Sequence, residues 1–315
     1  MAGDDVSGTG RPTEHERVVD ADGVRLVVTE AGPSDGPAVL LLHGFPDSRR
    51  SWRHLVPALA GAGYRVLAPD LRGYGDSDAP ADVDAYRLSR LRADVVAVLD
   101  DRGVRQAAVV GHDWGSVLGW SFAAAHPDRT AALVAVSVGH PRARAAGGPA
   151  QLVRGLYVWL FLVPGLAERL LPRRSWWALR RGGWDGAHPG DDPDLQRQLA
   201  DLSRPGRLTA ALAWYRANIR LPWRLPRGAT TGPRPDAAVT GRPARRHEVT
   251  CPVMGVWSTR DPALVERQMT ASRRHVAGTW RYEKLVGVDH WVPSHAPRSL
   301  ARLVLDFLRS ERYVP

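Results

Sequence analysis

The sequence predicts an α/β fold, in which helices cover both faces of a mostly parallel sheet and a separate block of helices is inserted near the middle of the chain. Two observations lead to this fold class. Short apolar runs alternate with segments of helical periodicity, as expected where helices connect parallel strands. The alternation stops near residue 140, gives way to helical segments alone, and resumes near residue 249. One sheet interrupted by an insertion accounts for both observations.

The sheet begins with a predicted hairpin, residues 16–20 and 24–30, joined by an Asp22-Gly23 turn. The run Ala-Val-Leu-Leu-Leu at residues 38–42 is uniformly apolar, which is typical of a strand buried on both faces. In segment 88–101 the apolar residues recur at spacings of three and four, which predicts a helix. By the same criteria, further strands are expected over residues 65–68, 107–110, 133–138, 253–257 and 279–283, and further helices over residues 51–60, 116–125, 264–274 and 298–308.

Composition divides the chain into four parts. Residues 1–13 are small and polar and are expected to form a flexible tail, whereas residues 14–139 and 249–315 form the predicted α/β core. Residues 140–225 contain helical segments without strands and form a predicted helical cap over the core. Residues 226–248 are rich in Pro, Gly and Arg, which is typical of a linker.

The overall composition excludes several classes of protein. Hydrophobic residues make up 44% and charged residues 24%, as in globular proteins. Cys251 is the only cysteine, so an internal disulfide is impossible and a cysteine-based metal centre is not expected. The most apolar run has nine residues, where a membrane-spanning helix needs about 20, and the polar N-terminus lacks the apolar region of a signal peptide. We therefore expect a cytoplasmic protein.

The net charge of +10 is concentrated in one part of the chain. The predicted cap holds 14 Arg against six acidic residues and the linker holds five Arg against two, whereas the remainder is almost neutral. A strongly basic surface can bind nucleic acid or an anionic membrane. Because the surplus is confined to the cap and linker, a nucleic-acid partner is not expected. Solvated helix faces, anionic or polar-headed substrates, and an acidic partner or membrane surface stay open as explanations.

A candidate nucleophile lies in the motif Gly111-His112-Asp113-Trp114-Gly115, between a predicted strand and a predicted helix. This context is that of a nucleophile elbow, a sharp turn that exposes its central side chain. Small residues two positions before and after the centre avoid clashes in such a turn. An aspartate carboxylate needs no deprotonation to act as a nucleophile at neutral pH. The alternative interpretation is that Asp113 only caps the helix that follows.

Backbone donors for an oxyanion hole are expected beside this turn. The motif His43-Gly44-Phe45-Pro46 follows the strand at residues 38–42. In a nucleophile-elbow architecture one N–H comes from the loop after this strand and the other from the residue after the nucleophile. These residues are Phe45 and Trp114.

The acid and the base of a catalytic triad are expected after the nucleophile in the chain, in that order. Asp261 comes just after the strand at residues 253–257, and His290 follows the strand at residues 279–283. Catalytic groups gather at such carboxyl ends of parallel strands. Asp289 and His295 are the alternative candidates.

These motifs resemble those of the α/β-hydrolase superfamily and, within it, those of the epoxide hydrolases. The similar segments are HGFP at 43–46, RGYGDSD at 72–78, GHDWGS at 111–116 and DHWVP at 289–293. The resemblance implies an α/β-hydrolase fold with an inserted cap, and two cap tyrosines that face the epoxide oxygen. The segments around Tyr157 and Tyr215 resemble the segments that carry these tyrosines. A phenol suits the role because ring opening generates an alkoxide.

The resemblance further implies an epoxide hydrolase that forms a covalent ester on Asp113, which water activated by His290 and Asp261 then hydrolyses to a vicinal diol. The expected substrate is a small apolar or mixed-polarity epoxide, and neither a metal nor an organic cofactor is expected. A haloalkane dehalogenase uses the same kind of nucleophile, but the Phe45 side chain has no N–H to offer a halide. A non-catalytic basic binding protein on the same scaffold is the alternative of another class.

Overall fold

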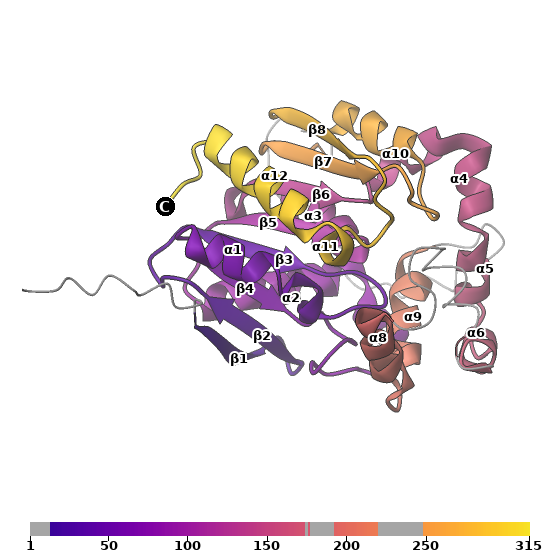
Figure 1. The fold of residues 1–315 in the computed structure, drawn as a ribbon. Helices are drawn as coiled ribbons and strands as arrows, with labels where there is room; N and C mark the ends of the chain where they lie inside the picture. Colours follow the sequence, from indigo (N-terminus) through magenta and orange to yellow (C-terminus); the bar gives the residue numbers. More distant parts are fainter. Residues whose placement is uncertain (1–12, 174–175, 177–191, 220–247) are drawn as a thin grey trace, which may run out of the picture.

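The computed structural model describes residues 13–173, 176, 192–219 and 248–315, which are built around an eight-stranded sheet (Figure 1). The strands lie in the order β1-β2-β4-β3-β5-β6-β7-β8. β2 pairs antiparallel with β1 and with β4, and all other neighbours pair parallel, which confirms the predicted fold class. The strands are β1 (Glu14–Asp20), β2 (Arg25–Ala31), β3 (Ala38–Leu42), β4 (Arg65–Pro69), β5 (Ala107–His112), β6 (Thr130–Val136), β7 (Val253–Ser258) and β8 (Trp280–Leu285).

Helices cover both faces of this sheet. Those outside the insertion are α1 (Leu55–Gly61), α2 (Leu88–Asp101), α3 (Trp114–Ala125), α10 (Glu266–Thr270), α11 (Val292–His295) and α12 (Pro297–Ser310). In β3, Val39 and Leu41 belong to the buried cluster that contains α1 and α12 residues, whereas Leu40 and Leu42 belong to the one with α2 and α3 residues. Successive strand residues thus face opposite helix layers, which explains why the whole strand is apolar.

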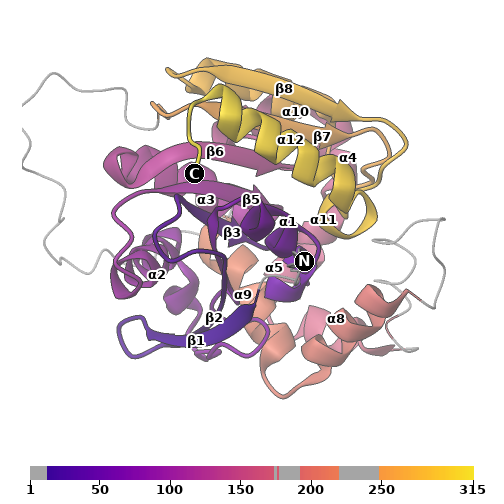
Figure 2. The ribbon, with the colours of Figure 1, turned by 60° about the vertical axis from the view of Figure 1, so that its left-hand side comes forward.

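Within the described residues, the connection from β6 to β7 is helical. After a 3₁₀ turn at Pro141–Gly147 it contains α4 (Gly148–Arg154), α5 (Leu156–Leu162), α6 (Leu166–Leu170), α8 (Pro193–Ser203) and α9 (Arg207–Asn218). These inserted helices lie together to the right of the sheet in Figure 1, and Figure 2 shows α8 next to α9. Most of the predicted tail and linker, residues 1–12 and 226–247, lies outside the described residues. None of the helices that are described is long and apolar enough to cross a bilayer.

Two predicted helices are shorter than their periodicity suggests. Segment 51–60 divides into a 3₁₀ turn at Arg49–Trp52 and the helix α1. Segment 264–274 begins as a turn, in which the Asp261 carboxylate accepts the backbone N–H groups of Ala263 and Leu264. The helix begins only at α10. The short helix α11 has no counterpart among the predicted elements.

Arginines of the inserted segment attach it to the core. Arg197 of α8 pairs with the buried Asp47 at 2.9 Å, and Gln198 beside it donates to the other oxygen of Asp47 at 2.6 Å. Three more arginines of the segment bind core groups: Arg204 binds Asp76, Arg207 the carbonyl of Ser77, and Arg154 the carbonyls of Asp261 and Leu264. Part of the basic surplus of the insertion is therefore used in docking.

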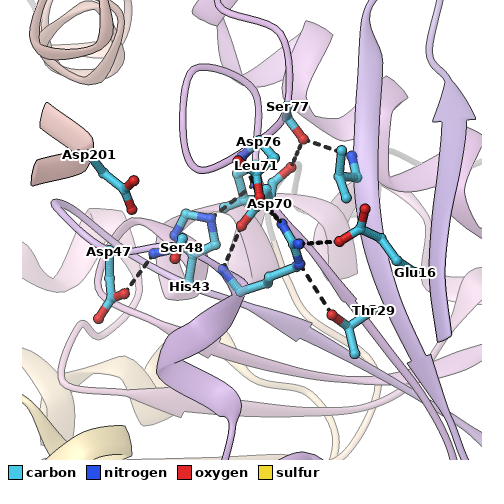
Figure 3. Close-up of polar contacts among 12 residues, drawn as sticks. Glu16, Thr29, His43, Asp47, Ser48, Asp70, Leu71, Asp76, Ser77 and Asp201 are labelled. Atoms are coloured by element: carbon cyan, nitrogen blue, oxygen red, sulfur yellow. Dashed lines mark hydrogen bonds and ion pairs between the residues drawn. The ribbon is translucent and has the colours of Figure 1, made fainter. Parts of the chain in front are cut away.

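A buried polar network supports the loop that follows β4 (Figure 3). The fully buried Asp70 carboxylate pairs with the Arg49 guanidinium, which also binds Glu16 of β1 at 2.6 Å. The Ser77 hydroxyl donates to the Asp70 carbonyl oxygen at 2.7 Å and accepts the Val27 N–H of β2 at 2.8 Å. The network thereby ties β1 and β2 to the loop on which the inserted helices dock.

Replacing Arg49 by Met should lower the free energy of unfolding by about 3 kcal/mol, because it leaves the Asp70 carboxylate buried without its counter-charge. The neighbouring Arg50 is exposed, so Arg50→Met is the matched control and should change stability by less than about 0.5 kcal/mol. Urea unfolding followed by circular dichroism measures both variants. Equal losses of stability in the two would contradict a structural role of the buried pair.

Candidate active site

The turn between β5 and α3 holds Asp113 in a strained backbone conformation. Its φ of 52° and ψ of −117° lie in a region that residues other than glycine rarely adopt. The side chain makes no capping hydrogen bond to α3, so the interpretation of Asp113 as a simple helix cap is wrong. The turn instead directs the carboxylate towards the loop that follows β3. There the carboxylate accepts a hydrogen bond from the Phe45 N–H.

Two glycines allow the backbone to pass close to this side chain. A β-carbon at Gly44 would lie 2.4 Å from the Asp113 Cβ, and one at Gly115 would lie 2.0 Å from the Leu42 carbonyl oxygen. Non-bonded atoms do not approach so closely, so both positions require glycine. Gly44, in the His-Gly-Phe-Pro motif, is therefore required for the nucleophile turn to fit against this loop.

The surroundings of Asp113 favour its ionised form. Burial alone would raise the pKa of its carboxyl, but His290 and the Phe45 N–H, which donates at 2.9 Å, hold the pKa below its ordinary value. Trp114, the other predicted oxyanion donor, is the first residue of α3, where backbone N–H groups have no partner inside the helix. The carboxylate therefore lies among groups that stabilise negative charge.

His290 lies between two carboxylates. Its Nδ1 is 2.8 Å from Asp261 Oδ2, and its Nε2 is 3.7 Å from Asp113 Oδ2. The other oxygen of Asp261 accepts the backbone N–H groups of Ala263 and Leu264 at 2.8 and 2.9 Å. Asp261 thus caps its own turn with one oxygen and orients His290 with the other.

The two carboxylates determine the charge of His290. Burial opposes a charged imidazole, but Asp261 and then Asp113 outweigh it and raise the pKa of His290 to about 10. At neutral pH the side chain is therefore an imidazolium. Loss of the negative charge on Asp113 would lower this pKa towards the range in which His290 accepts a proton.

The second candidate histidine belongs to a different set of contacts. His295 Nδ1 is 2.8 Å from Asp289 Oδ2, and its Nε2 is 3.2 Å from Asp192 Oδ2, just before α8. The Asp289 carboxylate therefore faces His295 and not His290. Asp192, Asp289 and His295 therefore link an inserted helix to the core. The nucleophile turn is instead contacted by His290, which Asp261 orients.

A cavity of about 430 Å³ is lined by both the nucleophile turn and the inserted helices. Asp113 and Trp114 line it from the core, Tyr157 from α5 and Tyr215 from α9. Tyr215 is buried, with its ring edge-on to that of Trp114 at 5.0 Å, whereas Tyr157 is 43% exposed. Both predicted tyrosines therefore share one cavity with the predicted nucleophile.

The two phenols of the cavity keep their protons at neutral pH. Desolvation is the largest cause that raises the pKa of Tyr157 and Tyr215 above the ordinary value, and the Asp113 charge adds to it. The remaining lining is largely apolar and includes Leu88, Val117, Val138, Leu152, Val158, Trp159, Leu162 and Ile219. In the part of the chain that is described, no three His, Cys, Asp or Glu side chains are grouped so as to hold a metal ion.

Two buried histidines beside the site have no role in the sequence prediction. His43 Nε2 accepts the Leu71 N–H at 3.0 Å, so Nδ1 carries the proton and donates to the Gly44 carbonyl oxygen at 3.0 Å. His112 Nε2 lies 2.9 Å from the His290 carbonyl oxygen and donates to it. Burial lowers the pKa of both histidines, so they are neutral and hold neighbouring loops in place. In the sequence, the feature that could have pointed to a supporting role is that each histidine lies in a motif of the site: His43 in the His-Gly-Phe-Pro motif and His112 in the nucleophile turn.

Comparison with known proteins agrees with this architecture. A family model for the α/β-hydrolase fold matches residues 37–294, so the chain belongs to the α/β-hydrolase family. It is also 36% identical to "Epoxide hydrolase A" of Mycobacterium tuberculosis, over 95% of this chain and 98% of that protein. Within the α/β-hydrolase family it is therefore a member of the epoxide hydrolases.

Solved structures show the same similarity. The crystal structure of epoxide hydrolase A from Mycobacterium thermoresistibile superposes with a TM-score of 0.74 at 31% identity, covering 94% of this chain and 98% of that chain. A structure of novel epoxide hydrolases from hot-environment metagenomes has a TM-score of 0.78 at 25% identity, covering 94% of this chain and 99% of that chain. This coverage extends over the inserted helices as well as the sheet.

The charge of His290 tests the geometry of the site. We expect its pKa near 10 in the intact protein and a lower value in Asp113→Ala, because that change removes one of the two carboxylates that favour the imidazolium. His295 keeps its partners and should titrate alike in both proteins. NMR of protein labelled with nitrogen-15 histidine measures both titrations. A midpoint near the ordinary value of about 6.5 in the intact protein would contradict the double ion pair.

Proposed function

We propose that this protein is an epoxide hydrolase that opens an epoxide to a vicinal diol through a covalent ester on Asp113. One observation carries this function: the carboxylate of Asp113 and the protonated phenols of Tyr157 and Tyr215 line the same cavity. Opening an epoxide needs a nucleophile at carbon and a proton donor at oxygen, and these groups supply both. The similarity to proteins named epoxide hydrolases supports the same activity.

In the first step, Asp113 Oδ attacks a carbon of the three-membered ring, and the bond from that carbon to the epoxide oxygen breaks. Tyr157 and Tyr215 donate hydrogen bonds to the oxygen, and one of the two phenols gives it a proton as it leaves. The product is an ester that joins the substrate to Asp113 and carries no charge. His290 then faces one carboxylate instead of two and releases its proton to solvent, from which the phenolate is reprotonated.

In the second step, neutral His290, oriented by Asp261, removes a proton from water. The water oxygen attacks the carboxyl carbon of Asp113, and the N–H groups of Phe45 and Trp114 bind the resulting oxyanion. Each such donor contributes about 3 kcal/mol to the stability of a transition state of this kind. Collapse of the intermediate transfers the proton from His290 to the departing alcohol and releases the diol. Asp113 is left as a carboxylic acid, whose proton passes to His290 and restores the carboxylate and the imidazolium.

In this mechanism the inserted helices act as a cap, because they bring both tyrosines to the cavity. We place the cap at residues 140–225 and the α/β core at residues 14–139 and 249–315, with a tail at residues 1–13 and a linker at residues 226–248. The largely apolar lining of the cavity favours a small epoxide of apolar or mixed polarity.

The two alternatives are not favoured. A haloalkane dehalogenase would need two side-chain N–H donors for the halide, and Phe45 offers none. A non-catalytic binding protein would have no use for a charged Asp113 that faces a histidine held by a second carboxylate, Asp261. The arginine surplus that suggested binding is used in part to dock the insertion.

A His290→Gln variant should form the ester and accumulate it, because the base for the second step is missing. Mass spectrometry of the protein after mixing with styrene oxide would show the added mass. His295→Gln, in which the histidine that faces away from Asp113 is changed, is the matched control and should turn over without accumulating ester. Single turnover of the intact protein in heavy-oxygen water should place the label in the Asp113 side chain, and an unlabelled side chain would rule out the ester.

Replacing Tyr215 by Phe should slow ester formation by about 100-fold, and the double change with Tyr157→Phe should slow it further, because the leaving oxygen loses its proton donors. Tyr86, whose hydroxyl donates to the Pro80 carbonyl oxygen outside the cavity, provides the control Tyr86→Phe. Stopped-flow quenching of tryptophan fluorescence follows the step. Undiminished ring opening in the double variant would remove both tyrosines from the mechanism.

A further inference from the structure

Four charged or amide side chains line the cavity in addition to the groups of the proposed reaction: Arg144, Gln151, Asn218 and Gln268. Three of them are occupied by the backbone. Gln151 bonds the Ala263 carbonyl and the Val265 N–H, Asn218 bonds the Leu88 N–H and the carbonyls of Tyr86 and Trp214, and Gln268 bonds the Gly139 N–H and the Ser137 carbonyl. Their hydrogen-bonding capacity is used to hold the walls of the cavity and not to receive a substrate.

Arg144 differs from these three. It is exposed on the 3₁₀ turn Pro141–Gly147, and it makes no ion pair with any residue that the structure describes. Other arginines of the insertion, such as Arg197 and Arg216, are paired with carboxylates. Arg144 is thus the cation of the cavity lining whose charge is uncommitted among the described residues.

The guanidinium of Arg144 lies near the start of α5. A β-carbon at Gly155 would be 3.0 Å from Arg144 Nη2, so the group rests against this glycine, two residues before Tyr157. Its charge also reaches that tyrosine, where it opposes the effects of burial and of Asp113 on the phenol pKa. The cavity therefore has a carboxylate from the core, an arginine from the insertion, and largely apolar walls.

We propose that Arg144 makes this cavity selective for epoxides that carry a carboxylate, an inference that rests on the proposed epoxide hydrolysis. A guanidinium binds a carboxylate through two parallel charge-assisted hydrogen bonds, while the apolar walls enclose the carbon skeleton. The negative charge of Asp113 repels the same carboxylate. The two charges together turn the oxirane towards the nucleophile and the substrate anion towards Arg144.

Matched substrates isolate the effect of the charge. The carboxylate of 4-carboxystyrene oxide and the methyl ester of the same acid differ in charge but share the ring and the oxirane. The intact protein should hydrolyse the carboxylate with a kcat/KM about five-fold above that of the ester, as expected for one charged contact at a solvated site. Arg144→Gln should abolish this preference, mainly through KM, and Arg144→Lys should retain part of it.

Arg142 provides the matched control, since it is an exposed arginine on the same turn that does not line the cavity. Arg142→Gln should keep the preference, and added salt should reduce it only in proteins that retain Arg144. Equal loss of activity towards both substrates in Arg144→Gln, with a shifted pH profile, would mean that Arg144 acts through Tyr157 and would overturn the selectivity. Hydrolysis of both substrates by the intact protein without a preference would do the same, whereas hydrolysis of neither would refute the epoxide hydrolase function itself.

Discussion

The negative charge of Asp113 is the constraint on which the surrounding structure depends. A carboxylate at this depth is stable only where donors and a counter-charge compensate for lost hydration. The Phe45 N–H and the His290 imidazolium provide them, and Gly44 and Gly115 permit the close approach. The strained φ of 52° at Asp113 follows from the same requirement, because a relaxed residue at the start of α3 would cap the helix instead of facing these groups.

The position of the inserted helices depends on the same loop that supports the nucleophile. Phe45 turns its N–H towards Asp113, and Asp47, two residues later, receives Arg197 and Gln198 from α8. One short loop therefore connects the nucleophile to the insertion. Part of the basic surplus of the insertion serves this docking: ionic and carbonyl contacts fix its position relative to the core, while the surfaces between them remain available to form an apolar cavity.

The sequence predicts those features that follow from local patterns. The strand β3 and the helix α2 have the predicted bounds, because the hydrophobic period of each is unbroken. The sequence predicts Asp261 as the acid and leaves Asp289 as the alternative, because both follow strands; the fold shows that Asp261 faces His290. Arg144, in contrast, is hidden among the arginines of the insertion. Its distinction is that it lines the cavity without an ion pair among the described residues, which is a property of the packing and not of any motif.

The coupling between Asp113 and His290 also orders the two halves of the proposed reaction. Two carboxylates raise the pKa of His290 to about 10, so the free protein holds an acid where the second step requires a base. In the proposed mechanism, an imidazolium at His290 cannot deprotonate water before the ester has formed. Esterification neutralises Asp113 and removes one of the two carboxylates that raise the pKa of His290, whereas Asp261 continues to hold Nδ1. In the proposed mechanism, formation of the ester therefore generates the base for its own hydrolysis, and the order of the two steps follows from the charge of Asp113.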